Sequence, residues 1–353
     1  MIYLNIWDDL PAPLYNESFY ESCDGIMAIS KQTLNINKIV LGDKQKGKVL
    51  KYVPHGINEK HFFPITKANT ELFESLQAFK KQIFGEKEYD YVVLYNARNI
   101  RRKSTSDLIL AYAQFCEKIG KQKAKRCVLL LHTQPVDENG TDLIAVQDLL
   151  CDPEYCNIVY TNRVLGVPEM NMLYNLADVT ALISSNEGWG LSLTESMICG
   201  KMIIANVTGG MQDQMRFEFE NGSWIDFDKD FCSNHFGTVK AHGKWAVPVY
   251  PSNMSVVGSV QTPYIFDDRA DFRDVTKAIE DVYNLTKEER AVKGNLGREW
   301  VLSDESMMTA TNMCKNVITT IDDTLTSFVP KPKFELIKTV PQPRRAVRHK
   351  LVY

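Results

Sequence analysis

Short runs of apolar residues alternate with longer segments that carry apolar residues at helical spacing, from the start of the chain to about residue 205. This alternation is typical of an α/β fold with parallel strands. Most of the runs are bounded by Gly, Pro, Asn or Asp, as strand ends commonly are. We therefore predict strands at Ile2–Ile6, Gly25–Ile29, Val49–Val53, Tyr91–Tyr95, Arg126–Leu131, Ile158–Tyr160, Val179–Ile183 and Met202–Ala205.

The clearest helical pattern follows Tyr91–Tyr95. Ser104 and Asp107 form an S-x-x-D pair just before it, which is a common start signal of a helix. The apolar residues that follow in the sequence have a spacing that places them on one face of a helix. The predicted buried face consists of Leu108, Ala111, Tyr112, Phe115 and Ile119.

A domain boundary is predicted where Pro54 and Pro64 enclose a polar stretch. We predict a partial N-terminal lobe over residues 1–56 and a C-terminal lobe over residues 57–328. Within the C-terminal lobe the alternation breaks down over residues 223–263, which are predicted to be an irregular insertion. Residues 329–353 contain seven Lys or Arg against Glu335 alone. This extended tail either is solvated or contacts nucleic acid or lipid.

Composition narrows the class of protein. A net charge of −3 provides no overall basic field for wrapping nucleic acid. The eight cysteines include no C-x-x-C pair, so we expect buried thiols rather than a zinc site. No apolar run is long enough for a membrane helix, and the first residues lack the features of a signal peptide. We therefore expect a soluble, cytoplasmic protein.

Three loops that follow predicted strands carry residues suited to binding a nucleotide. In the first, Arg98 and Lys103 stand between a strand end and a helix start, where a helix N-terminus also favours anions. Two cations at such a position suit a diphosphate, although a solvated basic loop has the same composition.

The second loop, Asn186–Glu195, contains Gly188 and Gly190, which allow a ligand to approach the backbone closely. Glu195 can accept hydrogen bonds from the two hydroxyls of a ribose, and Glu187 can face the sugar end of the same ligand. A glutamate early in a helix is also favourable with the helix dipole alone.

The third loop, Thr208–Gly210, either cradles a phosphate or sugar hydroxyl or forms a tight turn. Because the carboxyl ends of parallel strands meet at one edge of a sheet, all three loops should lie together.

The spacing Glu187-x7-Glu195 with Trp189 between the two residues resembles the E-x7-E signature of retaining GT-B glycosyltransferases, in the family-four-like group called glycosyl transferases group 1. Arg98-x4-Lys103 is similar to the diphosphate-binding Arg and Lys of that family, Pro54–Asn58 resembles its inter-lobe segment, and Gly209–Gly210 match its Gly-Gly turn. The resemblance runs from about residue 24 to residue 222.

This resemblance implies a GT-B fold with two Rossmann-like lobes, and a role for each matching residue. Arg98 and Lys103 would bind the diphosphate, Glu187 the transferred sugar and Glu195 the ribose. The remaining donor-binding positions would be Gly188, Trp189, Gly190, Leu191, Gly209 and Gly210. A nucleotide sugar would be the substrate, with no metal or other cofactor.

Three departures from the family pattern matter. The insertion at residues 223–263 is longer than a minimal member of the family needs. His55 replaces the usual Asn of the inter-lobe segment, and only about 55 residues precede that segment, too few for a complete acceptor lobe. We therefore expect Met1–Ile6 to be a poorly protected sheet edge. Transfer would then require an upstream extension or a partner that completes the lobe.

Three functions remain open. The first is transfer of a sugar to an acceptor hydroxyl with retention of configuration. The second is a nucleotide-sugar-binding module without activity. The third, suggested by virus-encoded relatives of such transferases, is transfer to modified DNA, while a glycan or a protein are the other acceptors considered.

His132 could line the site or serve as a core histidine. Trp224, Trp245, His235 and His242 could form an acceptor platform or simply pack.

Overall fold

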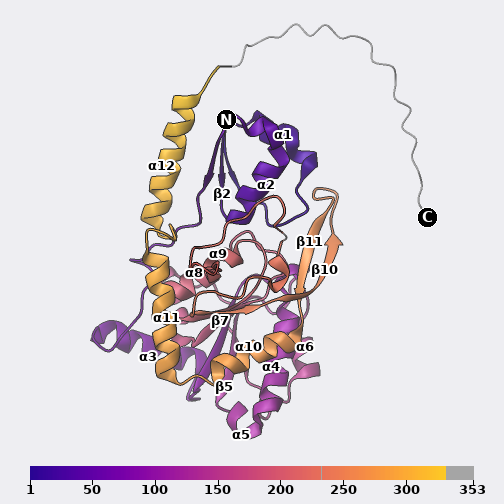
Figure 1. The fold of residues 1–353 in the computed structure, drawn as a ribbon. Coiled ribbons are helices and arrows are strands. Elements are labelled where there is room, and N and C mark those ends of the chain that lie inside the picture. Colours follow the sequence, from indigo (N-terminus) through magenta and orange to yellow (C-terminus); the bar gives the residue numbers. More distant parts are fainter. Residues whose placement is uncertain (232, 331–353) are drawn as a thin grey trace, which may run out of the picture.

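The computed structural model describes residues 1–231 and 233–330, and it contains two separate parallel sheets, one above the other (Figure 1). The smaller sheet has the strand order β1-β2-β3, with β1 (Ile2–Asn5), β2 (Gly25–Ala28) and β3 (Val49–Tyr52). The larger sheet has the order β6-β5-β4-β7-β8-β9. Its strands are β4 (Tyr91–Asn96), β5 (Cys127–His132), β6 (Ile158–Tyr160), β7 (Val179–Leu182), β8 (Met202–Asn206) and β9 (Ala246–Val249).

All eight predicted strands are present, with ends that differ by at most one residue. Strands β2, β4, β5, β7 and β8 are buried on both faces, as parallel strands between helical layers should be, whereas β1, β3 and β6 are partly exposed. The order of the large sheet changes direction between β4 and β7, so the loops that follow these two strands diverge around a crevice at their carboxyl ends. Both of the charged loops predicted from the sequence begin there.

Helices cover the large sheet. They are α3 (Thr70–Phe84), α4 (Thr105–Ile119), α5 (Lys121–Ala124), α6 (Leu143–Leu150), α7 (Val167–Leu176), α8 (Leu191–Ile198), α9 (Met211–Met215), α10 (Phe272–Tyr283) and α11 (Lys287–Leu302). Short 3-10 turns lie at Leu14–Asn16, Gly42–Gln45, Arg101–Lys103 and His235–Gly237.

Helix α4 confirms the predicted buried face, whose first four members are fully buried, while Ile119 is partly exposed. The predicted start of α4 is confirmed in position, because Ser104 directly precedes the helix, but the Ser104 side chain does not cap it. Ser104 adopts a left-handed conformation with φ 52°, and its side chain makes no capping hydrogen bond. Asp107 instead forms an ion pair with Arg269 at 3.3 Å. The 3-10 turn formed by the basic residues fixes the backbone of Ser104 before the helix begins.

The small sheet packs against α1 (Glu17–Ser22), α2 (Lys31–Leu41) and the C-terminal helix α12 (Ala310–Ser327). A Cβ atom on Gly25 of β2 would lie 2.4 Å from the Thr324 hydroxyl, so α12 lies very close to this strand. The predicted division placed residues 57–328 in one lobe, whereas α12 covers the N-terminal sheet (Figure 1).

The two lobes are joined where the chain crosses between them. Ile57 donates its backbone N–H to Met308 at 2.9 Å, and Ala310 donates to Ile57 at 3.0 Å. Gly56 allows this approach, because a Cβ atom there would lie 2.4 Å from the Thr309 carbonyl oxygen. The segment Pro54–Asn58 therefore lies at the junction of the lobes, as its resemblance implied.

The predicted insertion is more regular than expected. It contains β9, which extends the large sheet, and β10 (Pro251–Val257), which forms an antiparallel hairpin with β11 (Ile265–Ala270). Strand β11 binds both lobes: Phe266 donates its N–H to the Leu10 carbonyl at 2.7 Å, and Asp268 donates to the Ser185 carbonyl at 2.8 Å. The hairpin β10–β11 therefore bridges the lobes.

The aromatic residues of the predicted insertion pack together. Trp300 contacts Trp224 and Trp245 at centroid distances of 5.0 and 6.1 Å, and Phe217 contacts His235 at 4.6 Å and His242 at 6.0 Å. These contacts confirm the packing alternative for these residues over the acceptor platform.

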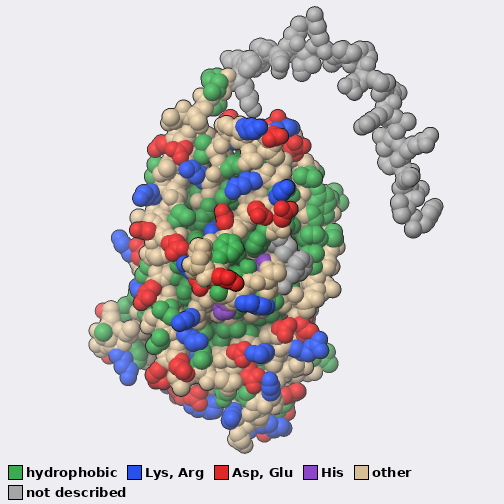
Figure 2. Space-filling view, in the orientation of Figure 1, with side chains coloured by type: hydrophobic (Ala, Val, Ile, Leu, Met, Phe, Trp, Pro, Cys, Tyr) green, Lys and Arg blue, Asp and Glu red, His purple; other side chains and the backbone are tan. Residues whose placement is uncertain are grey.

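Six of the seven described cysteines are buried, and all seven are free thiols. In the described part of the chain, no helix is long and apolar enough to cross a bilayer. Basic and acidic side chains are interspersed on the face shown in Figure 2. Almost all of the predicted basic tail, from residue 331 onward, lies outside the described residues.

Candidate active site

A cavity of about 470 Å³ lies between the two sheets at the carboxyl ends of β4 and β7. Its volume is within the range of small-molecule sites, roughly 300–1,000 Å³. The N-terminal lobe contributes Ile6, Asp8, Ile29 and His55. The C-terminal lobe contributes Asn96, Ala97, Arg98, Arg102, Lys103, Leu182, Glu187, Gly188, Trp189, Gly190, Leu191, Ser192 and Glu195. Eight of the ten predicted site residues are in this wall; Gly209 and Gly210 are not.

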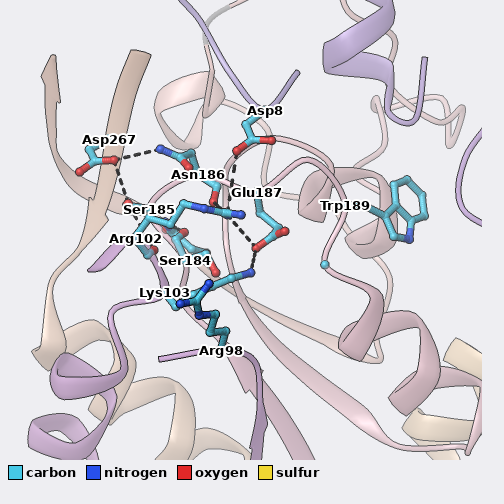
Figure 3. Close-up of polar contacts among 12 residues, drawn as sticks. Asp8, Arg98, Arg102, Lys103, Ser184, Ser185, Asn186, Glu187, Trp189 and Asp267 are labelled. Carbon is cyan, nitrogen blue, oxygen red and sulfur yellow. Dashed lines mark hydrogen bonds and ion pairs between the residues drawn. The ribbon is translucent and has the colours of Figure 1, made fainter. Parts of the chain in front are cut away.

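Lys103 and Glu187 form an ion pair in this wall, where only 11% of each side chain is exposed. Arg102 donates to the same carboxylate oxygen of Glu187 at 3.2 Å and to the Asn186 carbonyl at 2.7 Å (Figure 3). Burial lowers the pKa of Lys103, and the nearby Glu187 carboxylate opposes that effect. The result is a charged group in which Lys103 and Arg102 share the carboxylate of Glu187, and the carboxylate of Asp8 lies 3.9 Å from Arg102.

Arg98 lies at the more exposed side of the cavity. Its guanidinium forms a bidentate pair with Asp137, at 2.7 and 3.2 Å, and 63% of the side chain is exposed. Asp137 holds the guanidinium in one orientation, but solvent screens the pair strongly. Arg98 can therefore exchange or share this partner with an anion at low cost.

Glu195 lies in the second turn of α8, where its carboxylate accepts a hydrogen bond of 2.5 Å from the Tyr174 hydroxyl. Tyr174 in turn accepts a hydrogen bond of 2.7 Å from the Asn96 side chain. Burial raises the pKa of Glu195, and the Tyr174 hydrogen bond opposes that rise. The chain Asn96–Tyr174–Glu195 fixes the orientation of a carboxylate that lines the cavity.

The loop between the two glutamates is shaped by its glycines. Gly190 has φ +88°, a conformation that favours glycine, and it begins α8. A Cβ atom on Gly188 would lie 3.0 Å from both Asp8 and the Ile6 carbonyl oxygen, so Gly188 allows the N-terminal lobe to approach. Gly188 therefore serves the contact between lobes as well as lining the cavity.

Trp189 and Leu191 occupy different surroundings within the same loop. Trp189 is buried, donates its indole N–H to Thr194 at 3.0 Å, and points away from the Lys103–Glu187 pair (Figure 3). Leu191 is 45% exposed. Both line the cavity through part of their surface.

Gly209 and Gly210 lie behind the wall of the cavity. Gly210 donates its backbone N–H to the Glu187 carbonyl at 2.9 Å. Cβ atoms on Gly209 and Gly210 would lie 2.2 and 2.1 Å from the carbonyl oxygens of Glu187 and Gly188. In this structure the two glycines permit two loops to pack backbone to backbone, which supports the position of Glu187 from behind.

Thr208, next to these glycines, lies at the junction of the lobes. Its hydroxyl is 3.0 Å from the Asp9 carboxyl and 2.8 Å from that of Asp268. Burial and the neighbouring Asp268 hold the pKa of Asp9 well above its usual range. His132, at the end of β5, is hydrogen-bonded to Thr161 at 2.8 Å and is absent from the cavity wall.

Sequence reasoning missed Asp8, Arg102 and Tyr174. Arg102 is in the same basic run as Lys103, and Asp8 follows a predicted strand, so both had a local signal. Tyr174 had none, because it contacts Glu195 only through the packing of α7 against α8.

Known proteins resemble this chain in part of its sequence and in its fold. Residues 157–231, which include the Glu187–Glu195 loop, match the protein family described as glycosyl transferases group 1. No curated protein matches the full sequence.

Several solved structures have a similar fold. One is the sucrose-phosphate synthase of Thermosynechococcus elongatus, with a TM-score of 0.56, 18% identity, and coverage of 89% of this chain and 62% of that one. Another is Anabaena HepE in complex with UDP and glucose, with a TM-score of 0.60, 12% identity, and coverage of 91% and 71%. A third is the α,α-trehalose 6-phosphate synthase of Burkholderia multivorans, with a TM-score of 0.60, 10% identity, and coverage of 92% and 67%.

This chain therefore spans less than two thirds of the first of these proteins. At such low identities the likeness shows the fold, an α/β architecture with parallel sheets shared with GT-B glycosyltransferases.

Proposed function

We propose that this chain is a retaining glycosyltransferase of group 1, which transfers a sugar from a nucleotide-sugar donor to an acceptor hydroxyl. The observation that carries the proposal is the joint placement of Arg98, Lys103, Glu187 and Glu195 in one cavity between two parallel sheets. The match of residues 157–231 to the glycosyl transferase family supports the same activity.

In this proposal the diphosphate of the donor binds beside Arg98, Arg102 and Lys103, close to the free N–H groups at the start of α8. The bond between the anomeric carbon and the diphosphate oxygen breaks, and its electron pair goes to the diphosphate. The acceptor oxygen bonds to the same carbon, and its proton leaves with the diphosphate. Fixed cations next to the departing diphosphate lower the barrier without having to reorganise.

We assign the ribose to Glu195, because its fixed carboxylate can accept hydrogen bonds from two neighbouring hydroxyls. We assign the transferred sugar to Glu187, which lies between the cations and the N-terminal lobe. Arrival of the diphosphate would draw Lys103 and Arg102 away from Glu187 and free its carboxylate for the sugar. Because three side-chain cations supply the positive charge, the proposal includes no metal.

The test begins with thermal unfolding in the presence of UDP-, GDP-, ADP- and TDP-sugars. A donor at about 100 times its dissociation constant adds ~2.7 kcal/mol to the free energy of unfolding, which is easily measured as a shift in Tm. Transfer is then measured with the best donor, and the anomeric configuration of the product is read by NMR. Absence of a shift with every donor would overturn the proposal.

Binding without turnover would support the alternative, a nucleotide-sugar-binding module. The N-terminal sheet supports this alternative, because among the described residues it has three strands and its edge strand β1 pairs with β2 alone. Turnover on the order of 1 s⁻¹ would exclude it.

A further inference from the structure

A second cavity, of about 540 Å³, adjoins the first one on the side of the hairpin β10–β11. Ile6, Asp8 and Arg102 line both cavities, so the two are neighbours across these side chains. One wall comes from β1 and the residues after it, and the opposite wall comes from Val257 and Ile265 of the hairpin. Arg101, Arg102 and Asn186, which belong to the loops assigned to the nucleotide, complete the lining.

The walls of the second cavity combine apolar and polar surface. Trp7 and Tyr3 present partly exposed aromatic rings, and Ile265 faces them from the hairpin. The Trp7 indole is held in place by a hydrogen bond of 2.6 Å to the Asp9 carbonyl. A sugar ring has an apolar C–H face and a polar edge of hydroxyls, so a fixed aromatic ring beside polar groups suits it well.

The charged groups of this cavity balance one another. Arg101 and Arg102 face Asp8 and Asp267, and Asp267 accepts hydrogen bonds of 2.9 Å from both Ser185 and Asn186. Arg102 is engaged by Glu187 and Asn186. The first cavity is also lined by three cations and three carboxylates, so charge balance does not distinguish the two sites. The aromatic and aliphatic wall of Tyr3, Trp7 and Ile265 does, and it favours a neutral molecule with an apolar face over a polyanion.

Asp8 lines both cavities, and Figure 3 shows its carboxylate beside the Arg102 side chain. Its carboxylate lies 3.9 Å from Arg102, and within the described part of the chain no hydrogen bond to it is found. About a quarter of the side chain is exposed (27%), so the carboxylate is accessible from the cavities. An acceptor hydroxyl that reached the donor from the second cavity would have to pass this carboxylate.

We infer that the second cavity binds the acceptor, that the acceptor is a neutral carbohydrate, and that Asp8 accepts a hydrogen bond from the hydroxyl to be glycosylated. This inference rests on the proposed transferase function. Burial raises the pKa of Asp8 to about 6, so the group is ionised at neutral pH and able to accept that bond. The aromatic wall at Trp7 supplies the affinity for the sugar ring.

The experiment uses the full chain saturated with the nucleoside diphosphate that gives the largest thermal shift. Methyl glycosides of glucose, mannose and galactose are added, and binding is measured by saturation-transfer NMR and calorimetry. At least one neutral glycoside should bind. Asp8→Asn and Trp7→Ala should each weaken it at least tenfold, on the order of 1.4 kcal/mol, and Trp7→Ala should change the affinity for the nucleoside diphosphate less than twofold. Asp8→Asn removes a carboxylate 3.9 Å from Arg102, so it should leave the affinity for the nucleoside diphosphate equal to or above that of the parent.

A matched pair of variants tests the location. Val257 lines the second cavity, whereas its neighbour Val256 is 64% exposed and is absent from the walls of both cavities. Val257→Trp should abolish binding of the glycoside, and Val256→Trp should leave it unchanged. Glycoside binding that survives Val257→Trp would overturn the assignment of the cavity.

The remaining outcomes separate the two proposals. A thermal shift with a nucleotide sugar but no binding of any neutral glycoside would overturn this inference and leave the donor site standing. The absence of any shift would overturn the proposed function itself. Preferential binding of glucose 6-phosphate or of duplex DNA would overturn the neutral class of acceptor.

Discussion

The ammonium group of Lys103 is paired with the carboxylate of Glu187 inside the cleft, where each side chain is only 11% exposed. The family resemblance assigns Lys103 to the donor diphosphate and Glu187 to the transferred sugar. In this structure Glu187 therefore already neutralises the charge of Lys103. Donor binding must exchange one partner of Lys103 for another. Affinity for the diphosphate then depends on the difference between the two interactions, and this leads to the first prediction.

Glu187→Gln should raise the affinity for the nucleoside diphosphate several-fold, because Lys103 and Arg102 lose a competing carboxylate. Lys103→Met should lower the same affinity by at least tenfold, since a contact to phosphate is lost. Calorimetry with the nucleoside diphosphate and with the free nucleoside checks both values. If the nucleoside affinity changes as much as that of the diphosphate, the variants disturb the fold and not a phosphate contact.

Arg98→Ala should also weaken the diphosphate, and the effect should shrink as salt is added, because 63% of this side chain is exposed. Asp137→Asn serves as the partner control. It frees the Arg98 guanidinium, so it should leave diphosphate affinity equal to or above that of the parent. Salt-independent loss in Arg98→Ala would show that the residue acts through structure alone.

Glu195→Ala should weaken nucleotide binding while the fold stays intact. One or two hydrogen bonds to a charged group are lost, about 1.5–3 kcal/mol each. Tyr174→Phe should have a smaller effect in the same direction, because the carboxylate remains but loses its 2.5 Å partner. Glu71→Ala, at an exposed position in the first turn of α3, is the matched control. An unchanged dissociation constant in Glu195→Ala would remove this residue from the site.

Gly210→Ala should destabilise the protein by about 1–3 kcal/mol or more and weaken donor binding, because its Cβ atom would lie 2.1 Å from the Gly188 carbonyl oxygen. Gly166→Ala is a suitable control. Both glycines have φ −73°, but a Cβ atom at Gly166 meets nothing closer than 3.9 Å. Chemical denaturation measures the two variants. Equal stability of Gly210→Ala and Gly166→Ala would show that the loop behind Glu187 can move to accept the Cβ atom without loss of stability.

Asp213 should make the stability of the protein depend on pH. Its buried carboxylate accepts a hydrogen bond of 2.9 Å from the Lys31 N–H of the N-terminal lobe, and burial raises its pKa from 3.8 to about 7. The folded protein therefore keeps this proton where the unfolded chain has lost it. Its contribution to the free energy of unfolding falls as pH rises from about 4 to about 7.

The measurement is chemical denaturation of the parent and of Asp213→Asn at about pH 5 and about pH 8. The parent should lose on the order of 2–3 kcal/mol more than the variant across this interval, since each pH unit between the two pKa values corresponds to about 1.4 kcal/mol. The same loss in both proteins would contradict the assignment to Asp213.

The sequence predicted the parts of the fold that depend on local pattern. The eight apolar runs are strands, and those of β2, β4, β5, β7 and β8 leave an unbroken hydrophobic signal because these parallel strands are buried on both faces. The charged loops could be placed together because they follow neighbouring strands of one sheet. Even Glu187 and Lys103, 84 positions apart in the chain, were assigned to one site on this ground.

Other features depend on tertiary contacts and left no such pattern. Strand β11 contains Asp267 and Asp268, whose carboxylates are satisfied only by residues of distant loops. The position of α12 depends on the crossing at Ile57 and Thr309, although the helix itself was evident. Gly209 and Gly210 matched a motif, but only the structure reveals that another loop occupies the space beside them.

Strand β11 also bears on how substrates exchange. Its hydrogen bonds to Leu10 and Ser185 are made by Phe266 and Asp268, two residues apart, so the lobes cannot separate without breaking one of them or bending the strand. Each such bond contributes about 0.5–1.5 kcal/mol net, or about 1–3 kcal/mol for the pair. They add to other hydrogen bonds between the lobes, such as those of Lys31 with Asp213 and of Thr208 with Asp9. Opening the cleft by separating the lobes therefore breaks several hydrogen bonds together, and the hairpin adds to the free energy that such an opening requires.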